Sequence, residues 1–411
     1  MKRILHVNCT DAGSTGKIIN QISYYLQDKF DFFLCTPKIN TNNPPYLKKI
    51  RTSGKYEQAL YKRITAITGY RYSCSPHSTH RIISAIRKIK PDIIHFHSAN
   101  CYMANLYSIL KYAKRKDIAV VITNHAEFYY TGICSHSYDC MQWVDGCKKC
   151  PDLWGQAHSL FFDTTRRAWR KMKESLYAIP RIAVVSVSPW VRERSEKSQI
   201  MNGIPQFTVF NGVDTNVFRY IAQENEVMNK HLLREKTVLF VTAMFSDSED
   251  DAKGGKYIIQ LASKLEGKAK IVIIGKYNIN TKIPDNIIIK GVISDQSKLA
   301  EYYNVADVTV VASKRETFGM TVAESLCCGT PVIGFNSGGP ESIALDNYSD
   351  FVSYGDVNGL YRVALKWLNR DKKAFSSEIA ELAHQKYSSK FMAKGYNAIY
   401  THLLNYGKRE K

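Results

Sequence analysis

The chain has 411 residues, of which 45% are hydrophobic and 23% charged, and its formal net charge is +20. This length favours two or three domains, and the composition is that of an ordinary globular protein. No apolar stretch is long enough to span a bilayer, and residues 1–7 turn polar too soon for a signal peptide. We therefore expect a cytoplasmic protein.

The excess of Lys and Arg has three interpretations. The plainest is a solvated basic surface. Nucleic-acid binding is disfavoured, because the sequence contains no zinc-finger, RNP or helix-turn-helix pattern. The third is an anionic membrane surface, since basic and aromatic residues interleave in residues 61–72 and 161–173 as they do in interfacial amphipathic helices. Peripheral contact with the inner face of the cell membrane stays open.

The chain begins with a predicted strand at residues 2–8, a glycine-rich loop at 11–17 and a helix at 18–26. The loop is not a P-loop, because the motif needs glycine at position 11 and Ser or Thr at position 18. What remains is a flexible strand-to-helix loop that can approach a ligand closely through Gly13, Ser14 and Gly16. Residues 40–56 are polar and contain prolines, so they are expected to form a loop.

Two further strands end in polar residues. The strand at 91–98 places His95 and His97 on one face. The strand at 119–123 is followed by His125 at its carboxyl end, where ligands gather in open parallel sheets. A lone histidine is more often structural, but this placement favours a functional role for His125.

A dense group of cysteines follows, at Cys134, Cys140, Cys147 and Cys150. The Cys147–Cys150 spacing is that of a metal knuckle, whereas the Cys134–Cys140 spacing is looser than usual for structural zinc. In a reducing cytoplasm such thiols favour zinc over disulfides. Two interpretations stay open, a structural zinc that stiffens this loop and reduced cysteines that are merely packed.

The second half begins after a strand at 207–214 and a polar linker at 219–236, and it ends in helical spacing over 379–404. Its most informative stretch is a predicted βαβ unit: a strand at 308–312, a loop with Gly319, a helix at 321–326 and a strand from Val332. Its loop leads into a helix N-terminus, whose unpaired N–H groups suit a phosphate. Glu316 and Glu324 frame that loop.

These residues carry a family resemblance. Glu316 and Glu324, with Phe318-Gly319 between them and the stretches 329–333 and 338–341 behind them, resemble the donor-binding signature of retaining glycosyltransferases of family 4. The resemblance covers nearly the whole chain and is strongest over residues 305–341. It implies an α/β GT-B fold, in which two Rossmann-like doubly wound domains face each other across a cleft.

The implied domains are an acceptor-side domain at 1–218, a donor-binding domain at 237–393 and a C-terminal helix at 394–411 that returns to the first domain. The implied reaction moves a sugar from a nucleotide-diphosphate sugar to an acceptor hydroxyl with retention of configuration. A glycan or lipid-linked acceptor in surface polysaccharide assembly is expected from the family.

The resemblance also implies residue roles. Glu324 would bind the ribose hydroxyls, Glu316 the donor sugar, and Lys253 the diphosphate. His125 would stabilise the reacting sugar, and the backbone at Val292 would meet the base. The sugar and diphosphate would also be held by the amides of Phe318, Gly319 and Met320 with Thr321, and the loop of Gly13, Ser14 and Gly16 would lie near them. His95 and His97 would be cleft-lining or structural rather than metal ligands.

One departure puts the donor site in question. In the family, the strand equivalent to residues 237–243 ends in Gly-Arg, and that arginine joins a lysine at the diphosphate. Here Lys253 is present, the arginine is absent, and the acidic run 247–251 intervenes. We expect that run to point to solvent or to change the site.

No catalytic metal or other cofactor is expected, because the sequence has no Asp-x-Asp motif. No nucleophilic carboxylate is obvious in the first domain, so a front-face mechanism fits better than a covalent intermediate. The alternatives are a sugar-nucleotide epimerase or hydrolase with the same fold, and an inactive protein that binds membranes or nucleic acid.

Overall fold

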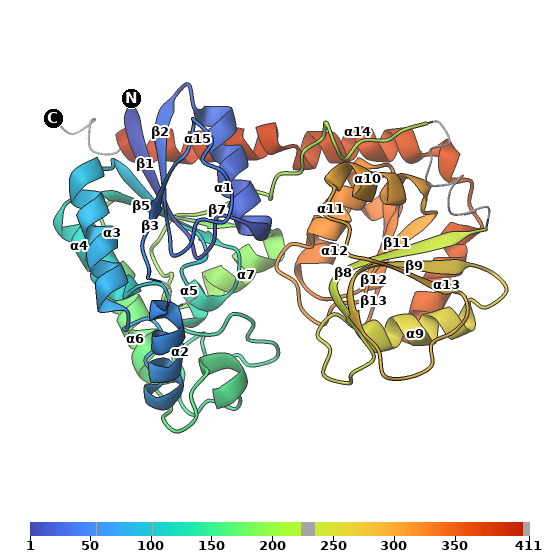
Figure 1. Ribbon diagram of the computed structural model, residues 1–411, viewed down its shortest axis with the longest axis horizontal. Helices are drawn as coiled ribbons and strands as arrows, with labels where there is room; N and C mark the ends of the chain where they lie inside the picture. Colours follow the sequence, from blue (N-terminus) through green and yellow to red (C-terminus); the bar gives the residue numbers. More distant parts are fainter. Residues whose placement is uncertain (55, 101, 223–234, 406–411) are drawn as a thin grey trace. The chain divides into compact units, whose positions relative to one another are not determined.

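This computed structural model describes residues 1–54, 56–100, 102–222 and 235–405. The chain forms two compact units (Figure 1). Unit 1 contains residues 1–210 and the chain from Met392 onward, and unit 2 contains residues 211–391. Most of the expected linker, residues 219–236, lies outside the described residues.

Unit 1 is built on a seven-stranded sheet in which every strand pairing is parallel. Its strands are β1 (Lys2–Val7), β2 (Phe30–Thr36), β3 (Lys48–Arg51), β4 (Ile93–Phe96), β5 (Ala119–Asn124), β6 (Ile182–Ser186) and β7 (Gln206–Thr208). Its helices are α1 (Gly13–Leu26), α2 (Glu57–Thr68), α3 (Pro76–Ile89), α4 (Leu106–Arg115), α5 (Phe128–Thr131), α6 (Thr165–Leu176), α7 (Pro189–Lys197) and most of α15 (Ser389–Asn405), with a π-helical turn at Leu153–Ala157. The strand order is β3-β2-β1-β4-β5-β6-β7.

Unit 2 repeats this arrangement with six parallel strands in the order β10-β9-β8-β11-β12-β13. They are β8 (Thr237–Ser246), β9 (Lys270–Asn278), β10 (Ile287–Gly291), β11 (Val308–Val311), β12 (Val332–Phe335) and β13 (Ser349–Val352). The helices are α9 (Gly255–Lys264), α10 (Gln296–Val305), α11 (Met320–Cys327), α12 (Gly339–Ile343), α13 (Val357–Leu368) and α14 (Ser376–Tyr387), with short 3₁₀ turns at Asp346–Tyr348 and Lys372–Ala374. The predicted doubly wound α/β fold is confirmed.

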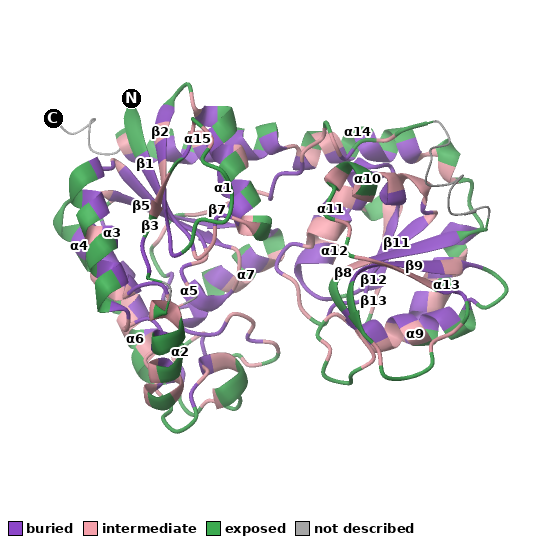
Figure 2. Ribbon diagram, viewed as in Figure 1, coloured by how far each residue is buried: buried purple, intermediate pink, exposed green. Residues whose placement is uncertain are grey.

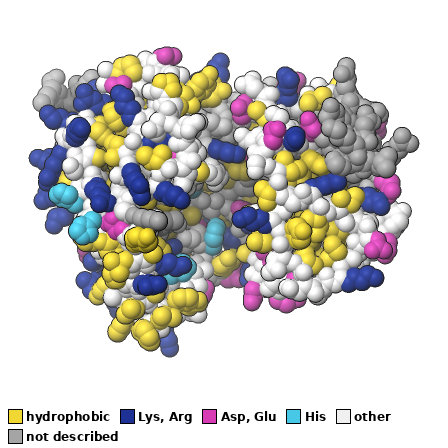
Figure 3. Space-filling model, in the orientation of Figure 1, with side chains coloured by type: hydrophobic (Ala, Val, Ile, Leu, Met, Phe, Trp, Pro, Cys, Tyr) yellow, Lys and Arg dark blue, Asp and Glu magenta, His cyan; other side chains and the backbone are white. Residues whose placement is uncertain are grey.

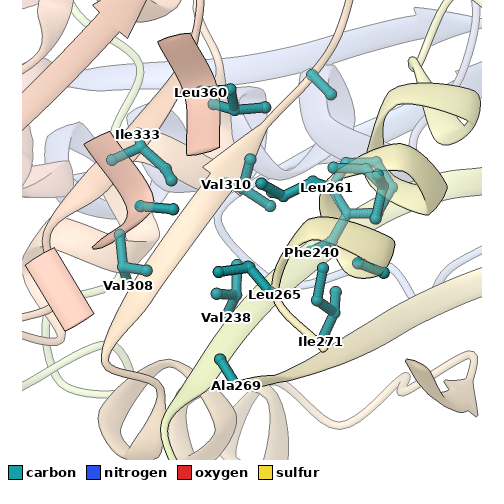
Figure 4. Close-up of a cluster of buried hydrophobic side chains, with 14 of the residues drawn as sticks. Val238, Phe240, Leu261, Leu265, Ala269, Ile271, Val308, Val310, Ile333 and Leu360 are labelled. Carbon is teal, nitrogen blue, oxygen red and sulfur yellow. The ribbon is translucent and has the colours of Figure 1, made fainter. Parts of the chain in front are cut away.

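Each sheet is buried by helices, as expected for parallel strands with continuous apolar runs (Figure 2). In unit 2, Val238 and Val310 of the strands pack with Leu261 of α9 and Leu360 of α13 (Figure 4). In unit 1, the core includes Tyr400 and other residues of α15, which come from the far end of the chain. No helix in the described part of the chain is both long and apolar enough to cross a membrane.

Three local predictions were wrong. The stretch expected as a glycine-rich loop starts helix α1 already at Gly13, so Gly13, Ser14 and Gly16 lie in its first residues. The polar, proline-containing stretch expected as loop includes strand β3, which is short and lies at the sheet edge, where a polar strand is tolerated. The strand expected at 207–214 is shorter, because β7 ends at Thr208. The helical pattern expected over 379–404 is confirmed, as two helices separated by the extended Ser388.

Candidate functional site

The strand order of each sheet reverses direction at one point, between β1 and β4 in unit 1 and between β8 and β11 in unit 2. In open parallel sheets, ligands bind outside the carboxyl ends of the strands at this switch point. In unit 2, Lys253 lies in the loop after β8 and Glu316 in the loop after β11. The topology alone therefore assigns both residues to the ligand-binding edge.

The two loops are in contact. The Lys253 ammonium forms an ion pair with the Glu316 carboxylate, whose Oε1 also accepts a hydrogen bond from Ser313 Oγ at 3.2 Å. A side chain on Gly254 would collide with the carbonyl oxygen of Ala312, so only glycine lets the loops approach this closely. The two charged side chains keep 36% and 26% of their surface exposed, which leaves them accessible to a ligand.

The acidic residues before Lys253 form hydrogen bonds and an ion pair with groups of their own unit. Asp251 accepts hydrogen bonds from the backbone N–H groups of Lys253 (3.0 Å) and Gly255 (2.9 Å) at the start of α9. Asp247 accepts hydrogen bonds from the backbone N–H groups of residues 280 and 281, and Glu249 pairs with Lys256. Asp251 therefore shapes the turn that presents Lys253, a role that the sequence did not suggest.

Helix α11 begins between Glu316 and Glu324, inside the motif that they frame. Gly319 is its N-cap residue with φ +87°, a left-handed conformation that favours glycine. An added Cβ would lie 2.9 Å from Cγ of Pro340, so the space is also limited. Phe318 is 3% exposed, and Met320 and Thr321 occupy the first helical positions. The side chain of Phe318 thus anchors the turn, and the first N–H groups of α11 form the positive end of the helix.

A second loop fixes the position of Glu316. Its N–H donates to the carbonyl of Ser337 (3.1 Å), and its carbonyl accepts from the N–H of Gly339 (2.8 Å). The carboxylate of Glu341 accepts hydrogen bonds from the N–H groups of Ser337 and Gly338 at 3.0 and 2.6 Å. The Gly-Gly-Pro-Glu element of the motif therefore holds the backbone of Glu316.

Glu324 lies one turn into α11. Its Oε2 accepts a hydrogen bond from the hydroxyl of Tyr303, on α10, at 3.0 Å. Burial, reinforced by the Glu324 carboxylate, raises the pKa of Tyr303 well above its usual value, so the tyrosine stays a donor. No local pattern points to Tyr303, because only the packing of α10 against α11 brings it to Glu324. Val292 follows β10 and is 60% exposed.

In unit 1, the turn between β1 and α1 is held by Asp11. This buried carboxylate pairs with Lys49 (3.1 Å) and accepts hydrogen bonds from the N–H groups of Asn40 (2.9 Å) and Thr41 (3.0 Å). These partners outweigh burial and hold the pKa of Asp11 below its usual range. Gly13 and Gly16 line a cavity of about 440 Å³ beside this turn. The predicted ligand loop is thus a helix start anchored by an ion pair.

His125 follows β5 and is half-buried. Its Nε2 lies 3.0 Å from Nδ1 of His97, and the two rings are stacked. His97 Nε2 lies in turn 2.9 Å from Nδ1 of His6. Burial lowers the pKa of His125 and of His6 to about 3, so these rings are neutral at pH 7. The sequence placed His95 and His97 on one face, but no local pattern pointed to His6.

The four cysteines are free, and no three of their sulfur atoms lie within 4.8 Å of one another. Burial, followed by the neighbouring thiols, raises the pKa of Cys134 well above its usual value and that of Cys147 to about 12. Neutral thiols in this arrangement fit packed cysteines. A structural zinc needs the sulfur atoms to move closer, so it stays a prediction.

Two protein-family models match this chain. The model described as Glycosyltransferase Family 4 matches residues 21–217, and the one described as Glycosyl transferases group 1 matches residues 224–378. The chain is also 23% identical over 325 residues to the putative colanic acid biosynthesis glycosyl transferase WcaC of Escherichia coli K12, over 77% of this chain and 78% of that protein.

Solved structures agree on the fold. Sucrose-phosphate synthase from Thermosynechococcus elongatus has a TM-score of 0.71 and 17% identity, over 98% of this chain and 99% of that one. HepE of Anabaena, solved in complex with UDP-glucose, has a TM-score of 0.64 and 11% identity, over 98% and 100% of the two chains. Together with the strand orders, these structures show the GT-B fold. The two family models and WcaC identify the chain as a glycosyltransferase of the family 4 type.

Proposed function

We propose that this enzyme transfers a sugar from a nucleotide-diphosphate sugar to an acceptor hydroxyl, with retention of the anomeric configuration. The observation that carries this proposal is the group formed by Lys253, Glu316 and the start of α11 at one switch point. A cation and a helix N-terminus stabilise the negative charge that develops on a departing diphosphate. Glu316, beside them, is placed to accept hydrogen bonds from sugar hydroxyls.

The nucleoside half of the donor is assigned to Glu324. A carboxylate accepts two hydrogen bonds from the cis-diol of a ribose, and the Tyr303 hydroxyl orients it from α10. The amides of Phe318, Gly319 and Met320, with Thr321, would hold the diphosphate and sugar. Lys314 and Arg315 lie in the same loop as Glu316 and add positive charge to it.

The remaining roles follow the family pattern. In unit 1, we assign contact with the donor sugar to His125 and close approach to the ligand to Gly13, Ser14 and Gly16, and we assign the base contact to the backbone at Val292. No divalent cation is assigned in this scheme, in which Lys253 and the helix end offset part of the diphosphate charge. A front-face reaction, in which the departing phosphate oxygen helps deprotonate the acceptor, is the proposed course. A trapped sugar–enzyme adduct would contradict it.

The donor assignment is tested by thermal stabilisation with UDP, GDP, ADP, CMP and their sugars. A ligand that binds only the folded state raises the melting temperature according to its occupancy. We expect one nucleotide diphosphate to raise the melting temperature and Glu324→Ala to abolish that rise. Tyr303→Phe should weaken the affinity for the nucleotide about fivefold, which corresponds to the loss of one hydrogen bond of about 1 kcal/mol. Glu266→Ala, an exposed carboxylate elsewhere in unit 2, is the matched control. Stabilisation that survives Glu324→Ala refutes the ribose role.

The acceptor is proposed to be a glycan or lipid-linked oligosaccharide of surface polysaccharide assembly, which WcaC suggests by its description. Contact with the cytoplasmic face of the membrane would bring the enzyme to such an acceptor. Incubation with the donor identified above and membrane extracts, followed by nuclear magnetic resonance of the product, gives both the acceptor and the anomeric configuration. An inverted anomer would refute retention.

We assign the proposed membrane contact to one exposed region of unit 1. Phe161 and Phe162 are 70% and 58% exposed, and the N–H of neighbouring Leu160 donates to the carbonyl of Ala66 on α2 at 2.8 Å. Ile67 of α2 is 53% exposed beside them. Hydrophobic and basic side chains lie together on this part of the molecule, at the lower left of Figure 3.

This region differs from the amphipathic helix expected at residues 161–173. Trp169 and Met172, on the apolar face of α6, are buried inside unit 1, so α6 offers only its basic face. Exposed aromatic side chains beside Lys and Arg suit an anionic bilayer. We expect flotation with phosphatidylglycerol vesicles, lost at high salt and in Phe161→Ser/Phe162→Ser. Tyr277→Ser, an exposed aromatic of unit 2, is the control. Unchanged flotation of the double variant refutes this surface.

A structural zinc with no part in the reaction stays our hypothesis for the cysteine loop, and it requires the sulfur atoms to move closer together than they lie here. Metal analysis of protein purified without a histidine tag tests it. About one zinc per chain, lost in Cys147→Ser but kept in Cys35→Ser, supports the site. Well under one zinc per chain leaves four packed cysteines.

A further inference from the structure

A chain of three histidines crosses the core of unit 1 at its switch point. His6 is on β1, His97 follows β4 and His125 follows β5, so each of three adjacent strands contributes one ring. The links are His6 Nδ1 to His97 Nε2 at 2.9 Å and His97 Nδ1 to His125 Nε2 at 3.0 Å. His6 and His97 are fully buried. The chain of rings therefore connects the interior of the sheet to its ligand-binding edge.

The number of N–H donors on each neutral ring limits how the three rings can be protonated. Burial without a neighbouring carboxylate keeps the rings neutral, which agrees with the lowered pKa of His97. A neutral imidazole has one N–H donor and one acceptor nitrogen. If His97 donated in both links it would be a cation, and if it accepted in both it would be an anion. Both links must therefore point the same way, which leaves two arrangements.

The surroundings of His6, at the buried end of the histidine chain, favour one of these two hydrogen-bond arrangements. His6 Nε2 is buried and has no hydrogen-bond partner. In one arrangement this nitrogen carries an N–H with no acceptor, and in the other it carries only a lone pair. Buried N–H groups without acceptors are rarer than acceptors without donors. The favoured arrangement has His6 donating to His97 and His97 donating to His125.

We propose that His97, supported by His6, is a positioning residue that keeps the proton of His125 on Nδ1. His125 then accepts a hydrogen bond at Nε2 and carries its donor at Nδ1. In the transfer reaction, on which this proposal rests, the ring is a neutral hydrogen-bond donor toward a sugar oxygen and not a base acting through Nε2. A fixed ring costs no reorganisation when the sugar reacts.

The tautomer can be observed without any substrate. In protein labelled with ¹⁵N in its histidine rings, two-bond proton–nitrogen correlations distinguish Nδ1–H from Nε2–H rings, and a His125→Gln spectrum assigns the signal. We expect His125 as the Nδ1–H form at pH 7.5. An Nε2–H ring overturns the proposal even if the enzyme is a glycosyltransferase. Conversely, an Nδ1–H ring in a protein with no nucleotide-sugar activity supports the proposal and refutes the function.

Two variants of His97 test its hydrogen bonds to His125 and to His6 separately. An Asn amide lies near the position of Nδ1 and keeps the hydrogen bond to His125, whereas a Gln amide reaches the position of Nε2 and keeps the one to His6. We expect His97→Asn to keep His125 in its Nδ1–H form and to change kcat by no more than about threefold. We expect His97→Gln to lose that form and to lower kcat by about 10- to 100-fold, a size typical of lost orienting partners. KM for the donor should change less than kcat.

His95 provides the matched control. It is equally buried and its ring lies against that of His97 at a tilt of 35°, but its nitrogens bond Tyr400 (2.7 Å) and Thr123 (2.8 Å) instead of the histidine chain. His95→Gln should leave the His125 tautomer unchanged. Equal effects of His97→Asn and His97→Gln on the tautomer, or an equal effect of His95→Gln, would overturn the positioning role.

Discussion

Units 1 and 2 share one strand order around their switch points but place different chemistry there. Unit 1 places neutral histidine rings there, bonded to one another, of which His6 and His97 are fully buried. Unit 2 places a partly exposed ion pair there, beside a glycine-capped helix. The difference shows that topology selects the location of a site, whereas burial without a counter-charge favours neutral groups there.

The comparison predicts that acid destabilises unit 1 first. The folded-state pKa values of His6, His95 and His97 lie below the unfolded value of 6.5, so below pH 6.5 the unfolded chain binds more protons and stability falls as the pH drops. One pH unit below 6.5, each costs about 1.4 kcal/mol, or up to about 4 kcal/mol for the three. Among the described residues, unit 2 has no fully buried histidine.

Hydrogen exchange resolved by mass spectrometry checks this prediction. Between pH 7.5 and 5.5, after correction for chemical exchange rates, peptides of β1, β4 and β5 should lose protection before those of β8 and β11. Equal loss in both units, or earlier loss in unit 2, would show that the histidines do not limit acid stability.

Charge is expected to matter more than shape at the unit 2 site. Lys253→Ala removes the cation that faces Glu316, and we expect a fall of about 100-fold in kcat/KM, or about 3 kcal/mol of transition-state stabilisation. Lys256→Ala removes a nearby lysine on α9 that pairs with Glu249 instead, and it should keep activity within about twofold. Steady-state kinetics on the donor distinguishes the two. Similar losses in both variants would point to a general electrostatic effect.

Backbone conformation at the two helix starts gives a smaller contrast. Gly319 and Gly13 both have positive φ, at +87° and +68°, but an added Cβ meets Pro340 at 2.9 Å in the first case and nothing within 4 Å in the second. We expect Gly319→Ala to destabilise unit 2 by about 2 kcal/mol and Gly13→Ala to destabilise unit 1 by about 1 kcal/mol. Urea unfolding measures both. A larger loss for Gly13→Ala would contradict the packing argument.

The smallest effect concerns a lysine of unit 2. The Lys372 ammonium donates to the carbonyls of Asn304 (2.6 Å) and Ala306 (2.7 Å) at the end of α10, and burial lowers its pKa to about 7. Because the unfolded pKa is higher, the unfolded chain binds more protons above pH 7, and stability rises with pH.

We expect a gain of about 1 kcal/mol between pH 7 and 8.5, discounted for partial exposure of the side chain, and no such gain in Lys372→Met. Urea unfolding of both proteins at the two pH values checks this. The same slope in Lys372→Met would assign the effect to another group. Unit 1 would thus respond to pH below 6.5 and unit 2 above 7.

Much of the fold could be predicted from the sequence, because buried parallel strands are continuous apolar runs such as residues 308–311, and glycines such as Gly319 and Gly329 mark helix ends. The short edge strand β3 could not, since its polar residues satisfy no burial pattern. The start of α1 was missed because Gly13 and Gly16 are poor helix formers that the Asp11 turn nevertheless accommodates.

The candidate site was predictable where a local motif carries it, as for Glu316 and Glu324. Partners that depend on how strands and helices pack were not. Tyr303 reaches Glu324 from another helix, and His6 meets His97 across a strand pairing whose register no local pattern reveals. Asp251 was expected near solvent or in the site, yet it accepts hydrogen bonds at the start of α9, because capping depends on a backbone turn that composition does not specify.

The position of helix α15 in the sequence affects when unit 1 can complete its core during synthesis on the ribosome. Tyr396 and Tyr400 belong to the core of unit 1 and bond Thr123 and His95, yet they follow every residue of unit 2 in the chain. The first half of the chain therefore emerges without the tyrosines that complete its interior, whereas the residues of unit 2 have all been added before them. The core of unit 1 can therefore be completed only after every residue of unit 2 has been synthesised.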